Sequence, residues 1–181
     1  GMSHFGNHEL IKNCTIYQDE GATTTLSMDY YLVFRGNHNM AVNNYVKRAN
    51  SGVGHTGYVG IKSGEDNGQH IGSVYNLFAN NKIYGIGRSL LARNSTTNFN
   101  VFKNNYVEGL GTKSGGGIAI FGGVKGNIWE GNTIKNVKEF IQIWGNSEDA
   151  WDTNKTMENN IIRNNTFHNA SELILGQNDD W

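Results

Sequence analysis

The feature that most restricts the fold of this chain is an eight-residue pattern that recurs six times. Its clearest copy is Asn-Val-Phe-Lys-Asn-Asn-Tyr-Val at residues 100–107. The other copies begin at residues 9, 39, 76, 127 and 160, and the segments between copies vary in length. A short pattern that returns about every 30 residues indicates a solenoid, in which each repeat stacks on its neighbours and the variable segments are loops.

Two positions of the pattern are apolar in every copy. The second is aliphatic or Met and the eighth is Ile, Val or Phe; in residues 100–107 these are Val101 and Val107. We expect both positions to form stacked core columns. Asn recurs between them, as at Asn105. Because Asn tolerates left-handed backbone angles and its amide both donates and accepts hydrogen bonds, we expect a turn there, with a ladder of amides along the stack.

A second short apolar segment follows each copy of the pattern. These segments lie at residues 31–34, 58–61, 89–91, 117–120, 140–143 and 173–175. Several alternate with a period of two, which is typical of a strand with one buried face, and helical periodicity is missing. The sequence therefore predicts an all-β fold: a solenoid of about six coils stacked in parallel, forming a single domain over residues 1–181.

Charge and composition limit the partners. Lys and Arg together number 15 and Asp and Glu 16, so no general basic field attracts nucleic acid or an anionic membrane surface. No apolar run approaches the roughly 20 residues that cross a bilayer. Cys14 is the single cysteine, which excludes an internal disulfide, and we interpret it as a core thiol. We expect no nucleic-acid and no membrane partner.

The six in-register repeats with Asn columns resemble the right-handed parallel β-helix, the pectate-lyase-like fold, over essentially the whole chain. This resemblance implies an acidic polysaccharide as partner, bound along one strand face, and a secreted or cell-surface location. The first copy starts at residue 9, which leaves little room for a capping helix. The chain therefore looks like a module or fragment of a longer solenoid, and copies could associate through its ends or faces.

One segment resembles polygalacturonase-type glycoside hydrolases. Residues 60–66 read Gly-Ile-Lys-Ser-Gly-Glu-Asp, similar to a run that follows the catalytic carboxylates of that family. The paired aspartates expected just upstream are replaced by Thr56 and Gly57, and the family's histidine by Ile86. Hydrolysis in that family needs carboxylates on both sides of the scissile bond. A degenerate polygalacturonase-like hydrolase is therefore an alternative that lacks its chemistry.

A second comparison is with β-helix lyases that act on alginate or dermatan-type chains. Their elimination needs a base beside the uronate carboxylate and a cation, either Ca²⁺ or Arg, that neutralises it. Lys62 and Arg93 resemble the Lys and Arg of such a site and fall on neighbouring coils, although their separation of 31 residues is one insertion longer than expected. The alternative is that both are solvated turn residues.

Further candidates surround this pair. His38 and His55 could act as acid or base near neutral pH, and Arg35 and Arg88 could bind substrate. The alternative is that each histidine is only a surface residue, which is the more common case for a single loop histidine.

Aromatic and acidic residues give two weaker signals. Phe78, Phe102 and Trp129 share the third position of the pattern, and strand alternation predicts that they point outward as a sugar-binding stripe. The alternative is an internal stack of rings. The acidic segment at residues 147–152 could hold Ca²⁺ through oxygen ligands, or could be a solvated loop. We assign no metal-binding residue.

The leading hypothesis is a carbohydrate-active β-helix that binds or cleaves an acidic polysaccharide, with lyase-type elimination preferred over hydrolysis. Elimination is preferred because Lys and Arg are present where the carboxylates are missing. The rival hypothesis is a non-catalytic structural or adhesive solenoid, such as part of a phage tail fibre or a cell-surface protein.

Overall fold

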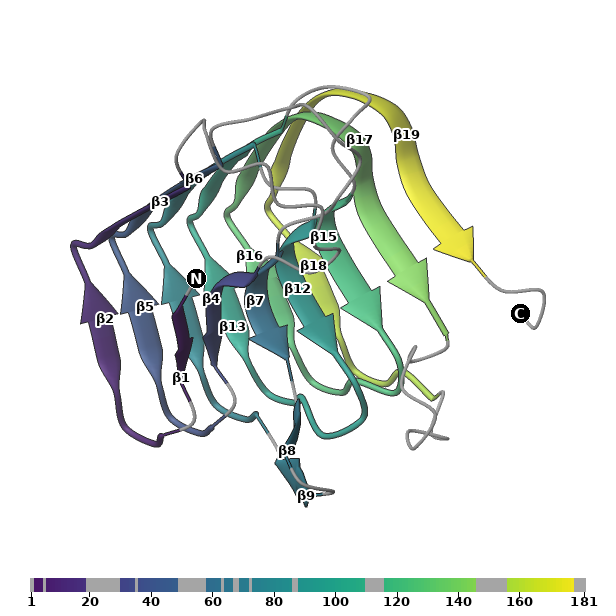
Figure 1. The fold of residues 1–181 in the computed structure, drawn as a ribbon. Coiled ribbons are helices and arrows are strands. Elements are labelled where there is room, and N and C mark those ends of the chain that lie inside the picture. Colours follow the sequence, from purple (N-terminus) through teal and green to yellow (C-terminus); the bar gives the residue numbers. More distant parts are fainter. Residues whose placement is uncertain are drawn as a thin grey trace.

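The computed structural model is all-β, with mainly parallel sheets, one of them strongly curled (Figure 1). It describes residues 2–4, 6–18, 30–34, 36–48, 58–62, 64–66, 69–71, 73–85, 88–109, 116–145 and 156–177. This arrangement is compatible with a parallel β-solenoid. In the part of the chain that the structure describes, no helix is long and apolar enough to cross a membrane.

The six-stranded sheet takes one strand from each copy of the pattern. We call the copies repeats 1 to 6 in chain order and number their residues as positions 1 to 8. Positions 2 to 4 form the strands β2 (Leu10–Lys12), β5 (Met40–Val42), β10 (Leu77–Ala79), β13 (Val101–Lys103), β16 (Ile128–Glu130) and β18 (Ile161–Arg163). All pairs in this sheet are parallel, and equivalent positions face one another, as Phe78 and Phe102 do. The repeats are therefore stacked in register.

The larger sheet has two halves joined by long strands. One half contains β3 (Thr15–Gln18), β6 (Tyr45–Arg48), β11 (Lys82–Tyr84) and β14 (Tyr106–Glu108). The other contains β1 (Met2–His4), β4 (Tyr30–Phe34), β7 (Tyr58–Lys62), β12 (Arg88–Arg93) and β15 (Gly116–Phe121). The strand β17 (Thr133–Trp144) pairs with both β14 and β15, and β19 (Thr166–Gln177) runs along β17. A separate antiparallel pair, β8 (Gly64–Asp66) and β9 (Gln69–Ile71), projects beyond β7 (Figure 1).

A tight turn joins the two strands of each repeat. The residue at position 5 has a positive φ in all six: 56° at Asn13, 57° at Asn43, 56° at Asn80, 53° at Asn104, 66° at Gly131 and 54° at Asn164. Asn and Gly adopt this left-handed conformation at the lowest cost, which explains their recurrence. The predicted turn is confirmed.

The asparagines at position 6 form a buried ladder. The backbone amide and the side-chain Nδ2 of Asn81 both donate to Asn105 Oδ1, each at 3.0 Å, and Asn105 repeats this pattern with Asn132 at 2.9 and 3.0 Å. A second ladder runs through position 1, for example from Asn76 to Asn100. Repeat 1 has Glu9 and Cys14 in these positions, so both ladders stop there. The predicted ladder at position 6 is confirmed, and a second ladder at position 1 accompanies it.

The core columns differ from the prediction in one respect. Position 8 is buried as expected, with exposed fractions of 0–7% from Ile16 to Ile134. Position 2 points outward instead: Leu10 is 61% exposed, and Met40 and Ile161 are each 41% exposed. Alternation along a three-residue strand places positions 2 and 4 on the face opposite position 3. The prediction that position 2 forms a core column was therefore wrong, and position 3 takes that place.

This change of face corrects the predicted sugar-binding stripe. Phe78, Phe102 and Trp129 are 0–1% exposed, and their rings stack inside the molecule at centroid distances of 5.4 and 5.2 Å. The Phe34 ring packs against that of Phe78 at a centroid distance of 5.1 Å, with the ring planes tilted by 49°. Rings with no exposed surface cannot cover a sugar, so the three residues belong to the core and not to a binding surface.

Candidate functional site

Lys62 and Arg93 end neighbouring parallel strands. In the pairing of β7 with β12, Arg93 faces Lys62, Ala92 faces Ile61 and Leu91 faces Gly60, while Arg88 faces Tyr58. The register shifts between Arg88 and Leu91, so β12 carries one extra residue there. This irregularity accounts for the 31-residue separation, and it brings the two backbones to the spacing of adjacent strands, about 4.8 Å. The structure describes the backbone of Lys62 but not its side chain.

Arg93 lies on the outward face of its sheet. Leu90 and Ala92 belong to the main core cluster. Leu91 belongs to a separate cluster on the other face, with Ala119, Phe121 and Trp144. Arg93 follows Leu91 by two residues and therefore shares this outward face. Its neighbours in register on the next strands are Phe121 and Trp144, which makes a row across β7, β12, β15 and β17.

Arg88 is held against the aromatic end of this row. Phe121 and Trp144 stack with centroids 4.4 Å apart and ring planes 7° apart. The guanidinium carbon of Arg88 lies 4.1 Å from the Trp144 ring centroid and 4.7 Å from that of Phe121. Its Nε donates a 2.9 Å hydrogen bond to Gln142 Oε1. Cation–π contacts with two rings and a side-chain hydrogen bond fix the direction of this cation.

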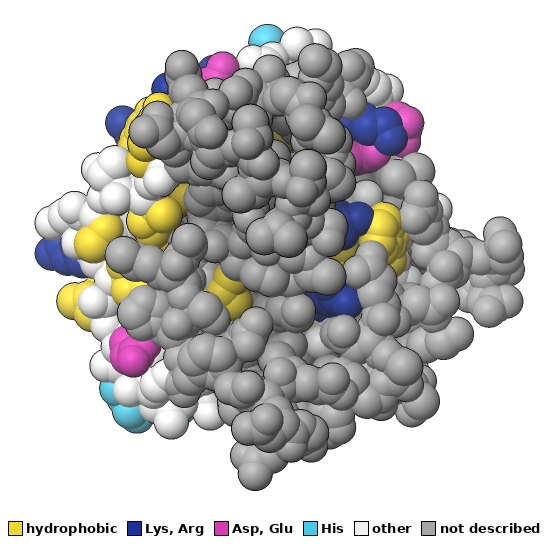
Figure 2. Space-filling model, in the orientation of Figure 1, with side chains coloured by type: hydrophobic (Ala, Val, Ile, Leu, Met, Phe, Trp, Pro, Cys, Tyr) yellow, Lys and Arg dark blue, Asp and Glu magenta, His cyan; other side chains and the backbone are white. Residues whose placement is uncertain are grey.

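The two arginines are largely covered. Arg88 is 8% exposed and Arg93 3% exposed. Figure 2 shows dark-blue Lys or Arg side chains beside yellow apolar ones over the region of β12, β15 and β17. Cations at a poorly solvated, partly aromatic surface interact strongly with a carboxylate, because less water screens the charges. We define the outward residues Arg88, Arg93, Phe121, Gln142 and Trp144, together with the register position of Lys62, as the β7–β12 site.

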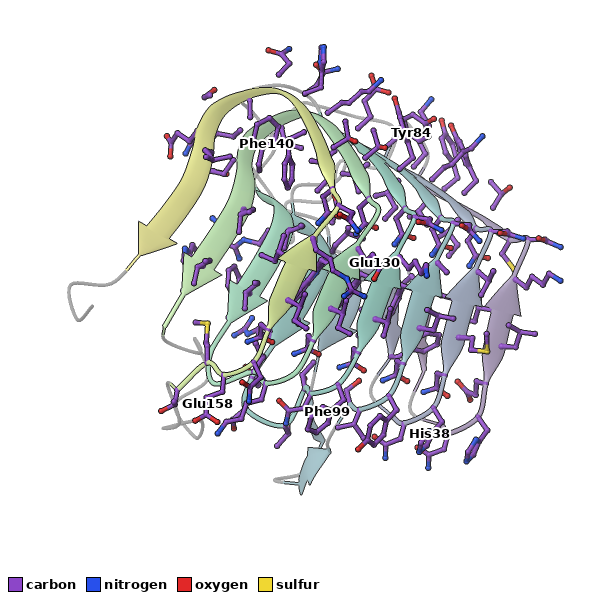
Figure 3. The ribbon with its side chains drawn as sticks, turned by 180° about the vertical axis from the view of Figure 1, so that it is seen from behind. His38, Tyr84, Phe99, Glu130, Phe140 and Glu158 are labelled. Carbon is purple, nitrogen blue, oxygen red and sulfur yellow. The ribbon has the colours of Figure 1, made fainter. Side chains whose placement is uncertain are left out.

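The histidine candidates lie elsewhere or outside the described residues. His38 is exposed on the turn between β4 and β5, with a φ of 59°. Its ring stacks between those of His8 and Tyr75, at 5.1 and 5.2 Å, along the edge of the molecule that carries Phe99 (Figure 3). This position contributes to a stack of exposed rings, and an acid or base role for His38 stays a prediction. His55, Arg35 and the acidic segment 147–152 lie outside the described residues.

No cluster of three or more His, Cys, Asp or Glu side chains suited to a metal ion occurs among the described residues. The described residues therefore assign no ligand to Ca²⁺, and Ca²⁺ binding by the segment 147–152 stays a prediction.

Three residues of the site were missed from the sequence: Phe121, Gln142 and Trp144. A signal for them exists, since all three lie on or directly after the second apolar segment of a repeat. They become neighbours of Arg88 and Arg93 only through the register of β12, β15 and β17. Because the loops between these strands differ in length, the register of β12, β15 and β17 cannot be counted from the sequence.

A second outward surface lies on the other half of the large sheet. Tyr45 and Tyr106 occupy position 7 of their repeats, while Tyr17 and Tyr84 directly follow position 8. The rings of Tyr45 and Tyr84 are 5.3 Å apart, and those of Tyr84 and Tyr106 are 5.7 Å apart. Figure 3 shows Tyr84 among side chains that point away from the ribbon. We call these four residues the tyrosine face.

The Tyr106 hydroxyl donates a 2.7 Å hydrogen bond to Glu108 Oε2. This bond raises the pKa of Tyr106 to about 12, with burial as a second cause, because ionisation would place two negative oxygens in contact. We expect Glu108→Gln to bring the Tyr106 pKa back toward its usual value of 10.0, measured by ultraviolet titration of tyrosinate.

The unfolded chain ionises this tyrosine first, so the stability that the bond contributes is present below about pH 10 and is lost as the pH rises toward 12. Glu130→Gln is the matched control, since Glu130 pairs with Arg163 and Lys103 on the other sheet. An unchanged Tyr106 titration in Glu108→Gln would contradict the assignment.

Comparison of the chain with family models, with curated proteins and with solved structures gives no match. Function must therefore be inferred from the residues themselves.

Proposed function

We propose that the chain is a right-handed parallel β-helix of six coils, similar to the pectate-lyase-like fold. Six in-register repeats, three parallel strands in most repeats and the paired asparagine ladders support this assignment. The asparagine turn between positions 4 and 7 is the element that such a stack needs at each level, because it bends the chain from one sheet into the next within two residues.

We propose further that this β-helix binds an acidic polysaccharide at the β7–β12 site and cleaves it by elimination. The observation that carries the proposal is the register pairing of Lys62 with Arg93 at the ends of adjacent strands. A base and a cation must act on the same uronate residue, and backbone positions about 4.8 Å apart on adjacent strands are compatible with this requirement. The proposal also uses Arg88, whose fixed guanidinium supplies a second carboxylate partner.

The proposed reaction assigns one task to each residue. The proposed reaction requires that the uronate carboxylate reaches Arg93, which is 3% exposed, and that Arg93 neutralises it; this stabilises the negative charge that develops beside the carboxylate. Lys62, as the uncharged amine, takes the proton from the carbon next to that carboxylate. The electron pair forms a carbon–carbon double bond, and the bond between the glycosidic oxygen and the ring carbon β to the carboxylate breaks. The leaving oxygen takes a proton from water and becomes the hydroxyl at the new chain end, and the protonated Lys62 returns its proton to solvent.

The test is the appearance of the unsaturated product. The protein is incubated with alginate, polygalacturonate or dermatan sulfate, with and without Ca²⁺, while near-ultraviolet absorbance is recorded. We expect product from one of these, and a loss of about 10² to 10⁴ in rate in Lys62→Ala and in Arg93→Ala. Lys103→Ala is the control, because Lys103 is exposed on the six-stranded sheet and should leave the rate unchanged.

Three outcomes would overturn parts of this proposal. Absence of product from all three polymers, with and without Ca²⁺, excludes elimination of these substrates. New reducing ends without unsaturated product would indicate hydrolysis, the polygalacturonase-like alternative. Full activity of Lys62→Ala would remove Lys62 from the mechanism even if the enzyme reading survived.

A structural or adhesive solenoid is the second candidate function. The outward column at position 2 favours it, since Leu10, Met40 and Ile161 leave 41–61% of their surface exposed on one sheet face. An exposed apolar column of this kind suits association between copies. A trimer by light scattering, together with absence of product in the assay above, would support this candidate and contradict the lyase.

A further inference from the structure

We propose that the tyrosine face is a second binding surface, which holds an extended anionic polysaccharide away from the β7–β12 site. This inference takes its ligand class from the proposed function, but its test does not depend on cleavage. The face lies on β3, β6, β11 and β14, whereas Arg88 and Arg93 lie on β12. A polymer held here would stay attached while another part of it occupies the β7–β12 site.

The rings form a zigzag row across successive strands, because Tyr45 and Tyr106 share one register position and Tyr84 lies two residues further along β11. Tyr45 contacts Tyr84, and Tyr84 contacts Tyr106, with ring planes tilted by 38° and 46°. Tyr17 lies at the end of the face and is 51% exposed. Aromatic rings cover the apolar faces of pyranose rings, and tyrosine hydroxyls remain available for hydrogen bonds. The strands are about 4.8 Å apart, which is close to the length of one sugar residue in an extended chain.

Lysines flank the rings and give this surface positive charge, which favours an anionic ligand. Lys47 Nζ lies 6.0 Å from the Tyr17 ring centroid, and Lys135 Nζ lies 5.6 Å from that of Tyr106. Lys82, paired in register with both Tyr45 and Tyr106, is exposed. Figure 2 shows dark-blue and yellow side chains together at the upper left, where β3 and β6 lie in Figure 1. Three lysines at these positions favour a polyanion over a neutral glucan.

One carboxylate lies on the same surface, and its oxygens already have partners. Glu108 Oε2 accepts from the Tyr106 hydroxyl, and Oε1 accepts from Asn136 Nδ2 at 3.2 Å. These bonds orient the Tyr106 ring and hold the Glu108 carboxylate in a fixed position.

The surface is also rigid before any ligand arrives. Position 8 lies between the outward positions on each strand, and Val46, Ile83 and Val107 are buried there at 0–1% exposure. The asparagine ladder at position 6 precedes each of these strands and fixes the repeats to one another. A backbone held in this way does not have to be ordered on binding, which favours affinity.

The test measures binding to alginate and polygalacturonate by affinity electrophoresis, with dextran as the neutral polymer. We expect the wild-type chain to be retarded by at least one polyanion and not by dextran. Tyr45→Ala/Tyr84→Ala should weaken this binding about tenfold, as should Lys47→Glu/Lys135→Glu. Tyr75→Ala is the control, because Tyr75 is an exposed tyrosine on a turn and should leave binding unchanged. Circular dichroism verifies that each variant is folded.

The outcomes separate this inference from the lyase proposal. Lys62→Ala/Arg93→Ala should lose product formation and still be retarded by the polyanion, which assigns retention to the tyrosine face. Folded tyrosine and lysine variants that bind as tightly as wild type would overturn the inference, whether or not product is formed. Failure of the wild-type chain to bind either polyanion would overturn it as well.

Discussion

Trp129→Ala is expected to lower the free energy of unfolding by about 3–5 kcal/mol, the range for truncating a buried aromatic side chain. Trp129 has no exposed surface, and its ring lies 5.2 Å from that of Phe102 with planes 3° apart. Its Nε1 donates a 3.1 Å hydrogen bond to the carbonyl oxygen of Leu90, which belongs to the opposite sheet. The substitution opens a cavity and also leaves that buried carbonyl without its indole partner.

Denaturant unfolding followed by circular dichroism measures this loss, with Trp129→Phe and Phe99→Ala as comparisons. Trp129→Phe keeps most of the stacked ring and should cost less than the alanine variant. Phe99 belongs to the other ring stack, beside Tyr75 at 5.4 Å, but is 49% exposed. Its truncation should cost less than about 1 kcal/mol, since most of its surface is already hydrated. Equal losses in Trp129→Ala and Phe99→Ala would contradict the assignment of Trp129 to the core.

The sequence predicted the strands and turns well because each repeat encodes them locally. Asn104 and Asn105 mark the turn, and Val107 alternates with polar neighbours, so these assignments need no distant information. The face of a strand is harder to infer. Position 2 is apolar in every repeat, yet Val101 lies outward while Phe102 lies inward. The chain turns between positions 4 and 7, where position 5 has a positive φ, so the inward direction of position 8 does not extend back by alternation to position 2.

The candidate site was predicted in part, because the repeat pattern shows where its short strands end. Lys62 and Arg93 each end a short apolar strand, so their adjacency followed from the repeat, and the irregularity between Arg88 and Leu91 accommodates the extra residue. The contact of Arg88 with Trp144 involves residues on β12 and β17, two strands apart. That register depends on loop lengths that differ between repeats, which a single sequence does not resolve.

Asn105→Ala is expected to destabilise the fold by about 2–6 kcal/mol although it removes only one small polar side chain. Asn105 is 1% exposed, and its Oδ1 accepts from both the backbone amide and Nδ2 of Asn81. Its Nδ2 donates to the Phe78 carbonyl and to Asn132 Oδ1, each at 3.0 Å. The Asn81 backbone amide and the Phe78 carbonyl lose these partners where water does not reach, at about 1–3 kcal/mol for each group.

Two control variants, Asn104→Gly and Asn165→Ala, test whether the loss of stability in Asn105→Ala comes from the ladder hydrogen bonds. Asn104 is the preceding residue of the same turn, but it is exposed and has a φ of 53°, which glycine adopts freely. Its substitution should change stability by less than about 1 kcal/mol. Asn165 is the last member of the ladder in repeat 6 and is only half-buried, so water can replace part of its bonding and the loss should be smaller than at Asn105.

In denaturant unfolding, the loss in free energy of unfolding should therefore be larger for Asn105→Ala than for Asn165→Ala, and larger for Asn165→Ala than for Asn104→Gly. The reverse order would mean that the turn conformation, and not the buried amide stack, holds neighbouring repeats together.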